Sequence, residues 1–187
     1  MDRIQKLLEA IDRWADFTIK IRRQIHENPE LSYKEFETSA LIANVLTRLG
    51  IPYVESPVKP GLIATIDSGK PGKLLVLRGD MDALPVQEET DLPFKSKNDG
   101  IMHACGHDVH TSNLLTVGGI LNEMKEEWTG RVRLVFQPAE EHGGGGREMI
   151  KAGLFDEMPD CCLGVHVWPD KRGKITLGRG YRTAYSD

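Results

Sequence analysis

Short apolar runs alternate with helical patterns along this chain, and this order constrains the fold more than any other feature of the sequence. Apolar residues recur at helical spacing before the first run, at 114–124, and near 146–152, where Gly153 closes the pattern. The alternation predicts an α/β domain with a mixed, largely parallel sheet flanked by helices. Four runs rich in leucine and β-branched residues are typical of its strands: GLIATID (61–67), KLLVLRG (73–79), VRLVF (132–136) and CCLGVHV (161–167).

Two helices are predicted before the first strand. Apolar residues at helical spacing in the N-terminal segment predict an amphipathic helix that ends near His26, because Pro29 interrupts the pattern. Ser32 followed by Glu35 has the spacing of a capping box, which predicts that a second helix begins there. Gly50 stands where the left-handed C-terminal cap of that helix is expected.

Composition excludes several classes of partner. With 187 residues, of which 40% are hydrophobic, the chain suits one domain or a large piece of a bigger protein. The net charge of −4 offers no basic surface for a phosphate backbone, so no nucleic-acid partner is expected. Charges recur throughout MDRIQKLLEAIDRWADFTIKIRRQI, which leaves neither a signal-peptide core nor a membrane span. We therefore expect a cytoplasmic protein without a membrane partner.

The cysteines do not form a secreted disulfide framework. There are three, and Cys161 and Cys162 are adjacent, where a disulfide would be strained. We expect both to be reduced and buried. Cys105 differs because its neighbours in MHACGHDVH are polar.

Ionisable residues follow the predicted strands at their carboxyl ends. Asp80 and Asp82 come after the second run, Glu140 and Glu141 follow the third, and His166 lies near the end of the fourth. The segment MHACGHDVH precedes a helix and can face the same edge of the sheet. Ligands of open α/β sheets bind beyond this edge, so we expect four segments to build one site there.

The residue types at this edge favour a metal. Cys105 and His107 are two apart, which places both side chains on one side of an extended segment. Glu141 and His166 would complete a set of nitrogen, oxygen and sulfur ligands suited to zinc or a similar divalent ion. Adjacent side chains diverge in an extended chain, so one residue of the pair Glu140 and Glu141 can bind the metal while the other stays free as general base for a metal-activated water.

Two other interpretations of these residues remain open. In the first, Cys105 is a small buried hydrophobe, His107 is a hydrogen-bonded loop histidine and the glutamates are a solvated strand end. In the second, Cys105 is a nucleophile with a histidine base, although His107 is poorly placed as that base.

Five ordered motifs carry a resemblance to a known family. In IHENPELSYKEFET, LRGDMDALPVQE, MHACGHDVHTSNLL, VRLVFQPAEE and LGVHVWPD, the chain resembles the N-terminal half of the M20 metallopeptidase family. The resemblance is to its amidohydrolase branch, which includes hippurate hydrolase, N-acyl-amino-acid deacylases and auxin-conjugate hydrolases. It implies that residues 1–187 are the N-terminal part of a zinc-peptidase-like catalytic domain. The inserted lid and dimerisation domain and the C-terminal part of the catalytic domain would then be absent.

The resemblance also implies roles for individual residues. The family site is dinuclear with one shared ligand, so two divalent ions are expected; the thiolate favours zinc, and manganese is the alternative. Asp80 falls where other branches place a ligand histidine, and we treat it only as a further contact. Cys105, His107, Glu141 and His166 match the metal ligands, Glu140 matches the general base, and Asp82 matches the aspartate that orients a ligand histidine.

The activity implied by the resemblance is hydrolysis of the amide bond of N-acyl amino acids or small peptide-like substrates. A metal-activated water would attack the carbonyl, with Glu140 as general base. In the family a fifth ligand, a lid residue and the dimer interface follow later in the chain. The alternative is therefore a truncated metal-binding fragment with weak or no activity, and a homodimer stays open for the full-length protein.

Three further histidines receive more ordinary roles. His103 and His110 are expected to be structural or to contact the ligands from outside. His142 follows the glutamate pair, and it is either a solvated loop residue or an extra ligand.

Overall fold

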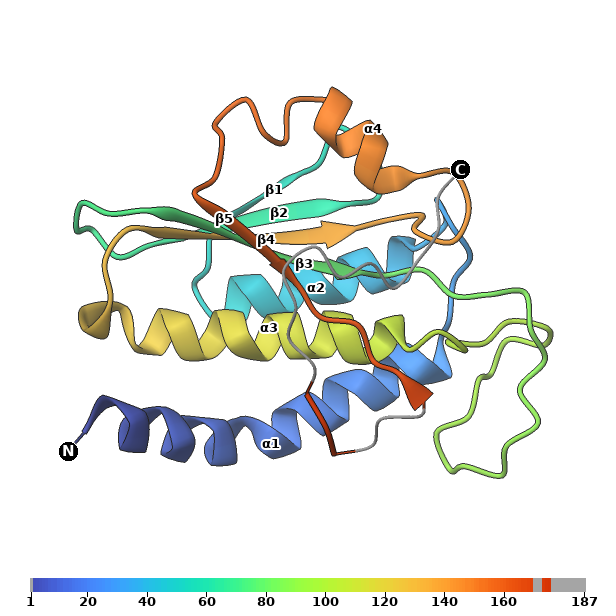
Figure 1. Cartoon of the computed structure of the whole chain (residues 1–187). Coiled ribbons are helices and arrows are strands. Elements are labelled where there is room, and N and C mark those ends of the chain that lie inside the picture. Colours follow the sequence, from blue (N-terminus) through green and yellow to red (C-terminus); the bar gives the residue numbers. More distant parts are fainter. Residues whose placement is uncertain (1, 170–172, 176–187) are drawn as a thin grey trace.

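A five-stranded sheet separates a layer of helices from one short helix on the opposite face, and Figure 1 shows α2 and α3 beneath the sheet and α4 above it. The computed structural model describes residues 2–169 and 173–175. The helix α1 packs on α3 as an outer layer. The elements are α1 (Arg3–Glu27), α2 (Phe36–Arg48), β1 (Tyr53–Glu55), β2 (Leu62–Asp67), β3 (Leu74–Asp80), α3 (His107–Glu123), η1 (Lys125–Glu127), β4 (Arg131–Gln137), α4 (Gly145–Lys151) and β5 (Cys161–Gly164).

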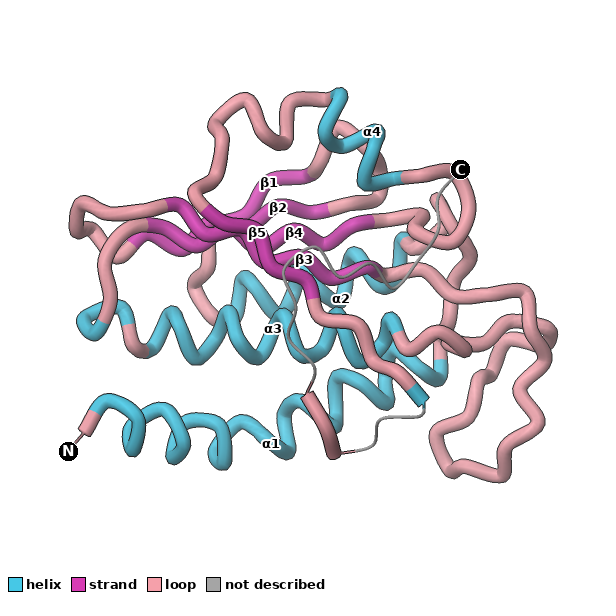
Figure 2. Tube along the Cα trace, viewed as in Figure 1, coloured by secondary structure: helices cyan, strands magenta, loops and turns pink. Residues whose placement is uncertain are grey.

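The sheet is mixed, with the strand order β1-β2-β4-β3-β5 (Figure 2). The strands β4, β3 and β5 are parallel neighbours, whereas β2 runs antiparallel to both β1 and β4. Asp80 lies opposite Gln137, so β3 and β4 end at the same edge. The α/β class predicted from the sequence is confirmed, and the parallel strands are the three that precede the candidate site residues.

The main core lies between the sheet and the helices α1, α2 and α3. Alternate residues of β2 face it, as the period of LIATID requires, and β4 contributes Leu134 and Phe136. Ile42 and Leu46 of α2 and Leu115 of α3 cover them, and all five of these named side chains are fully buried. Among the described residues, no helix combines the length and apolarity needed to cross a bilayer.

The capping box predicted at Ser32 and Glu35 is wrong. Neither side chain bonds to the first turn of α2. Glu30 takes that role, because its carboxylate accepts the N–H groups of Glu37 at 3.0 Å and Thr38 at 2.8 Å. Ser32 and Glu35 instead turn towards the edge of the sheet, where buried partners outcompete the local cap.

The prediction that Cys161 and Cys162 are buried is also wrong for this chain, although both are reduced thiols as expected. Both side chains are exposed, as is the rest of β5. The physical reason is that, among the described residues, β5 is the end strand of the sheet and pairs with β3 alone. An apolar run marks a strand, but its burial depends on which elements lie beside it.

A buried charge network joins α1 to the start of α3. The His26 ring lies 2.8 Å from Asp108 through Nδ1 and 3.2 Å from Glu88 through Nε2. Arg22 pairs with the same Asp108 oxygen at 2.7 Å. The hydrogen bond to Asp108 raises the pKa of His26 and outweighs burial, which lowers it. The network fixes the long loop that precedes α3 against α1.

Replacing His26 with Leu is expected to lower the free energy of unfolding by about 3–5 kcal/mol, because two buried carboxylates lose the cation between them. The raised pKa sets the pH dependence. The stabilisation by His26 is complete between the acid range, in which the carboxylates become protonated, and pH 6.5, the ordinary His pKa. It is lost as the pH rises through the raised pKa of His26 in the folded protein. Denaturant titrations at several pH values measure this, with the exposed His142→Leu as control. A pH-independent difference between wild type and His26→Leu would contradict the charged role.

Candidate metal centre

Three strand ends and one helix start converge on the candidate site. Asp80 ends β3, Glu140 and Glu141 follow β4, His166 follows β5, and His107 is the first residue of α3. The convergence predicted from the order of the sequence is therefore present in the structure. Parallel strands produce it, because their carboxyl ends lie at one edge of the sheet.

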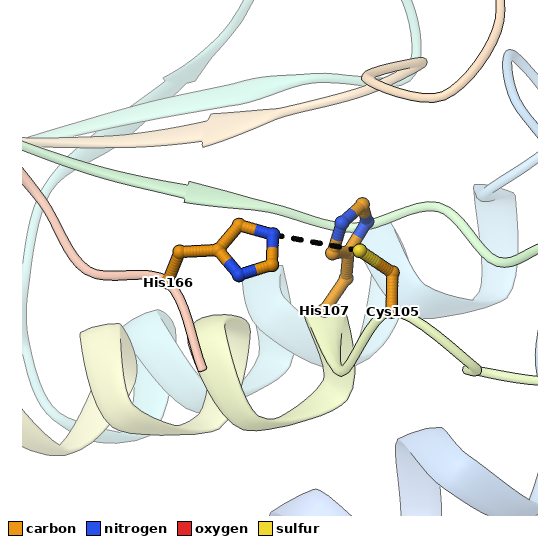
Figure 3. A group of neighbouring side chains, drawn as sticks. All are labelled: Cys105, His107 and His166. Atoms are coloured by element: carbon orange, nitrogen blue, oxygen red, sulfur yellow. Dashed lines mark hydrogen bonds between the residues drawn. The ribbon is translucent and has the colours of Figure 1, made fainter. Parts of the chain in front are cut away.

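The first cluster consists of Cys105, His107 and His166, shown in Figure 3. One ligand atom from each lies within 4.8 Å of the others, and Cys105 Sγ is 3.4 Å from His166 Nε2. His107 is fully buried, whereas Cys105 is half-buried. A thiolate and two imidazoles at this spacing are a zinc-type donor set.

Gly106 makes this arrangement sterically accessible. It adopts a φ of 88°, in the left-handed region that residues with a side chain disfavour. A Cβ atom there would lie 2.4 Å from Cγ2 of Val167. The glycine therefore lets the start of α3 approach the segment after β5, which brings Cys105 and His107 to His166.

A second cluster joins His107 to the two glutamates. His107 Nε2 lies 3.7 Å from an oxygen of Glu141 and 4.0 Å from an oxygen of Glu140. On the other side of the ring, Nδ1 is 3.3 Å from Asp82 Oδ1. Because Asp82 engages Nδ1, the Nε2 atom faces the carboxylates. Both glutamates therefore approach the same imidazole, from a loop that follows the end of β4.

Two buried atoms in this cluster have no hydrogen-bond partner. They are Nε2 of His107 and Oε1 of Glu141, which face each other across the 3.7 Å gap. Unpaired buried polar atoms are costly, so a structure that retains them has a use for them. A divalent cation would pair with both, and the donor types suit zinc. The residues present thus fit a metal.

The electrostatics of the cluster favour positive charge. Burial lowers the pKa of His107, but the hydrogen bond to Asp82 and the nearby Cys105 and Asp80 outweigh it and raise the pKa to about 11. Burial, Asp80 and Glu141 together raise the pKa of Glu140 above its ordinary value. A site that holds an imidazolium so strongly also stabilises a bound cation.

Asp80 and His110 form a third cluster with His107, in which Asp80 Oδ2 accepts no hydrogen bond and lies 3.6 Å from His107 Nε2, whereas the other polar atoms of Asp80 and His110 have hydrogen-bond partners. His110 Nδ1 donates to Asp80 Oδ1 at 2.6 Å, and His110 Nε2 accepts the N–H of Val167 at 2.9 Å. Arg78 pairs with the other Asp80 oxygen at 2.7 Å. Burial raises the pKa of Asp80, but hydrogen bonding to His110 and the charge of Arg78 outweigh it and lower the pKa. This geometry favours the structural role expected for His110.

The other two histidines lie outside these clusters. His103 is buried with neither ring nitrogen hydrogen-bonded, and burial lowers its pKa to about 4. His142 is exposed, and its Nδ1 lies 3.0 Å from the carbonyl oxygen of Glu141. The geometry therefore favours a solvated loop residue over an extra ligand at His142.

Two side chains at the site were not predicted from the sequence. Ser32 donates its hydroxyl to Asp82 Oδ2 at 2.6 Å, and Glu35 Oε1 accepts the N–H of Ala139 at 2.7 Å. The one signal in the sequence is their place in IHENPELSYKEFET, a motif of the family resemblance in which the spacing of Ser32 and Glu35 instead predicts a helix start. Their partners lie 50 and 104 positions away in the chain, beyond the reach of local patterns.

Comparisons with known proteins give a consistent result. The profile of peptidase family M20/M25/M40 matches residues 76–180. Thermostable carboxypeptidase 2 of Saccharolobus solfataricus is 48% identical over 170 residues, which cover 89% of this chain and 43% of the relative. N-acetyl-L-cysteine deacetylase of Bacillus subtilis is 46% identical over 152 residues, covering 81% of this chain and 36% of the relative.

A solved structure agrees with both relatives. It is a Bacillus subtilis protein described as a dinuclear metal binding peptidase from the M20 family, with a TM-score of 0.82 and 42% identity. The match covers 86% of this chain and 45% of that one. The chain thus spans less than half the length of each of these three proteins.

Replacing His110 with Leu is expected to weaken Zn²⁺ binding about 10–100-fold, because the Val167 N–H that locates the segment of His166 loses its acceptor. Calorimetric titration of the metal-free protein with Zn²⁺ measures the affinity. His142→Ala is the control, and its affinity should equal that of the wild type. Loss of metal from His142→Ala would instead identify His142 as a ligand.

Proposed function

This chain belongs to peptidase family M20/M25/M40, and from that premise we propose that it takes part in metal-dependent hydrolysis of amide bonds in N-acyl amino acids or small peptide-like substrates. The observation that carries the proposal is the unpaired, buried Nε2 of His107, surrounded by the donor groups of three strand ends. A carboxypeptidase and an N-acetyl-L-cysteine deacetylase both cleave an amide whose nitrogen belongs to an amino acid, which supports this substrate class.

We assign the ligands to Cys105, His107, Glu141 and His166. Their atoms meet at His107, which belongs to both the cysteine cluster and the glutamate cluster. A relative described as dinuclear supports two divalent ions. The thiolate of Cys105 favours zinc, and manganese is the alternative. Residues 1–187 would then form the N-terminal part of the catalytic domain in a cytoplasmic enzyme, with a homodimer open for the full-length protein.

Bound divalent ions would supply an activated water and polarise the scissile carbonyl. In this proposal Glu140 would take the proton of the attacking water and return it to the leaving amine. Its side chain is 29% exposed and can thus meet substrate and solvent, and the raised pKa brings it closer to the working pH of a general base. Asp82 holds the His107 ring through Nδ1 and accepts the N–H groups of Glu140 and Glu141. It therefore orients both the base and a ligand.

The first test is metal content. Elemental analysis of the purified chain should give about two equivalents of divalent metal, as two-metal hydrolases hold. Glu141→Gln should lose metal, because its oxygen is one of the two unpaired atoms that face each other. A chain without metal, in a buffer that supplies zinc or manganese, would overturn the proposal.

The second test is hydrolysis of a panel of N-acyl amino acids. Glu140→Gln should keep its metal and lose turnover by at least about 10²-fold, because the amide cannot accept a proton. Turnover that survives in Glu140→Gln would contradict the role of base. Activity that a chelator abolishes, yet which survives thiol alkylation in the presence of metal, would exclude a Cys105 nucleophile. Bound metal without turnover in the wild type would favour the metal-binding fragment.

A further inference from the structure

Glu35 is a fully buried acid that the chemistry above does not use. It stands immediately before α2, and none of its side chain is exposed. A carboxyl group in such a place is costly unless its oxygens are paired. One oxygen, Oε2, has no hydrogen-bond partner, so the cost is only partly offset.

The other oxygen holds an unusual backbone conformation. Glu35 Oε1 accepts the N–H of Ala139 at 2.7 Å. Ala139 has a φ of 51°, in the left-handed region that a residue with a Cβ atom disfavours. Such a conformation persists only where its surroundings impose it. Ala139 directly precedes Glu140 and Glu141, so its conformation sets the direction of both.

Three consecutive backbone N–H groups are bound by two buried carboxyl groups. Ala139 donates to Glu35, while Glu140 and Glu141 donate to the two oxygens of Asp82 at 3.0 Å and 2.9 Å. The acceptors come from the start of α2 and from the segment after β3. The short turn after β4 is thus held by carboxyl groups from two separate segments.

We propose that Glu35 is a positioning residue that imposes the left-handed turn at Ala139 and thereby aims Glu140 and Glu141 at His107. The predicted effect of Glu35 on metal binding rests on the proposed function, whereas its effect on the backbone turn does not. Glu35 is neither a proposed metal ligand nor the proposed base. It acts on Glu140 and Glu141 through the backbone at Ala139.

The protonation of Glu35 is compatible with this role. Burial raises the pKa of Glu35 to about 7, so the neutral acid is well populated near neutral pH. The carbonyl oxygen of a neutral acid still accepts an N–H, and so does that of an amide. Glu35→Gln should therefore keep the contact with Ala139. Leu, which has no acceptor, and Asp, which is one methylene shorter, should lose it.

The decisive measurement compares these variants with a matched control, Glu37→Gln, which makes the same change at an exposed position of α2. Amide hydrogen exchange of residues 139–141, followed by NMR, needs no metal. Glu35→Leu and Glu35→Asp should speed the exchange of Ala139 by at least about tenfold, because its N–H loses a buried acceptor. Glu35→Gln and Glu37→Gln should match the wild type.

Titration with Co²⁺ alone measures how the Glu35 variants change metal binding. Glu35→Leu and Glu35→Asp should bind Co²⁺ about 10–100-fold more weakly, with an altered visible spectrum, and Glu35→Gln should restore both. Adding Ala139→Gly to Glu35→Leu should recover part of the affinity, since glycine adopts the left-handed region freely. A merely structural Glu35 would change the melting temperature without this pattern of loss and rescue.

The two proposals fail in different ways. A wild-type chain that takes up no Co²⁺ would overturn the proposed function, while amide exchange would still decide the role of Glu35. Unchanged exchange at Ala139 in folded Glu35→Asp would overturn the positioning role. So would wild-type Co²⁺ affinity in both Glu35→Asp and Glu35→Leu. Should Glu35→Leu fail to fold, Glu35→Asp retains an acid at the site and carries the test.

Discussion

The Asp82 carboxylate is the interaction on which the candidate site depends. It receives the Ser32 hydroxyl, the Nδ1 side of His107, and the backbone N–H groups of Glu140 and Glu141. These groups come from three separate segments, so one side chain sets their relative positions. Burial raises the pKa of Asp82, but the hydrogen bonds outweigh it and lower the pKa, which keeps the carboxylate ionised. A neutral residue could not satisfy four donors in this way.

Much of the fold follows from local patterns, because strand and helix periods are properties of neighbouring residues. The strands ending at Asp80 and near Gln137 were placed within a residue or two, and their carboxyl ends carry the ionisable residues. The short strand Tyr53–Glu55 was not predicted, since all three of its residues are exposed and carry no alternation. The same limit explains the wrong burial of Cys161 and Cys162, which depends on what lies beside β5 rather than on the run itself.

The site was predictable to the extent that its residues follow strand ends. Cys105, His107, Glu141 and His166 were chosen by type and position, and the structure brings their side chains around His107. Their assignment as ligands remains a proposal. Glu35 could not be found in this way, because its role depends on a hydrogen bond to Ala139, which is 104 positions away. Residues that shape a site from another element leave no periodic signal in their own segment.

The site joins a buried half to a more exposed half, and the two are held by different forces. His107 and the turn of the glutamates rest on β3, β4 and α3, whose packing forms the core. His166 follows β5, an exposed end strand, and a hydrogen bond from Val167 to His110 anchors its segment. His110 is held in turn by Asp80, the last residue of β3. Because β5 is exposed in the described part of the chain, the hydrogen bonds of His110 with Asp80 and Val167 are what link the segment of His166 to the core. Two buried carboxylates at and just after the end of β3 therefore organise both halves, Asp82 through the glutamate turn and Asp80 through His110 and the segment after β5.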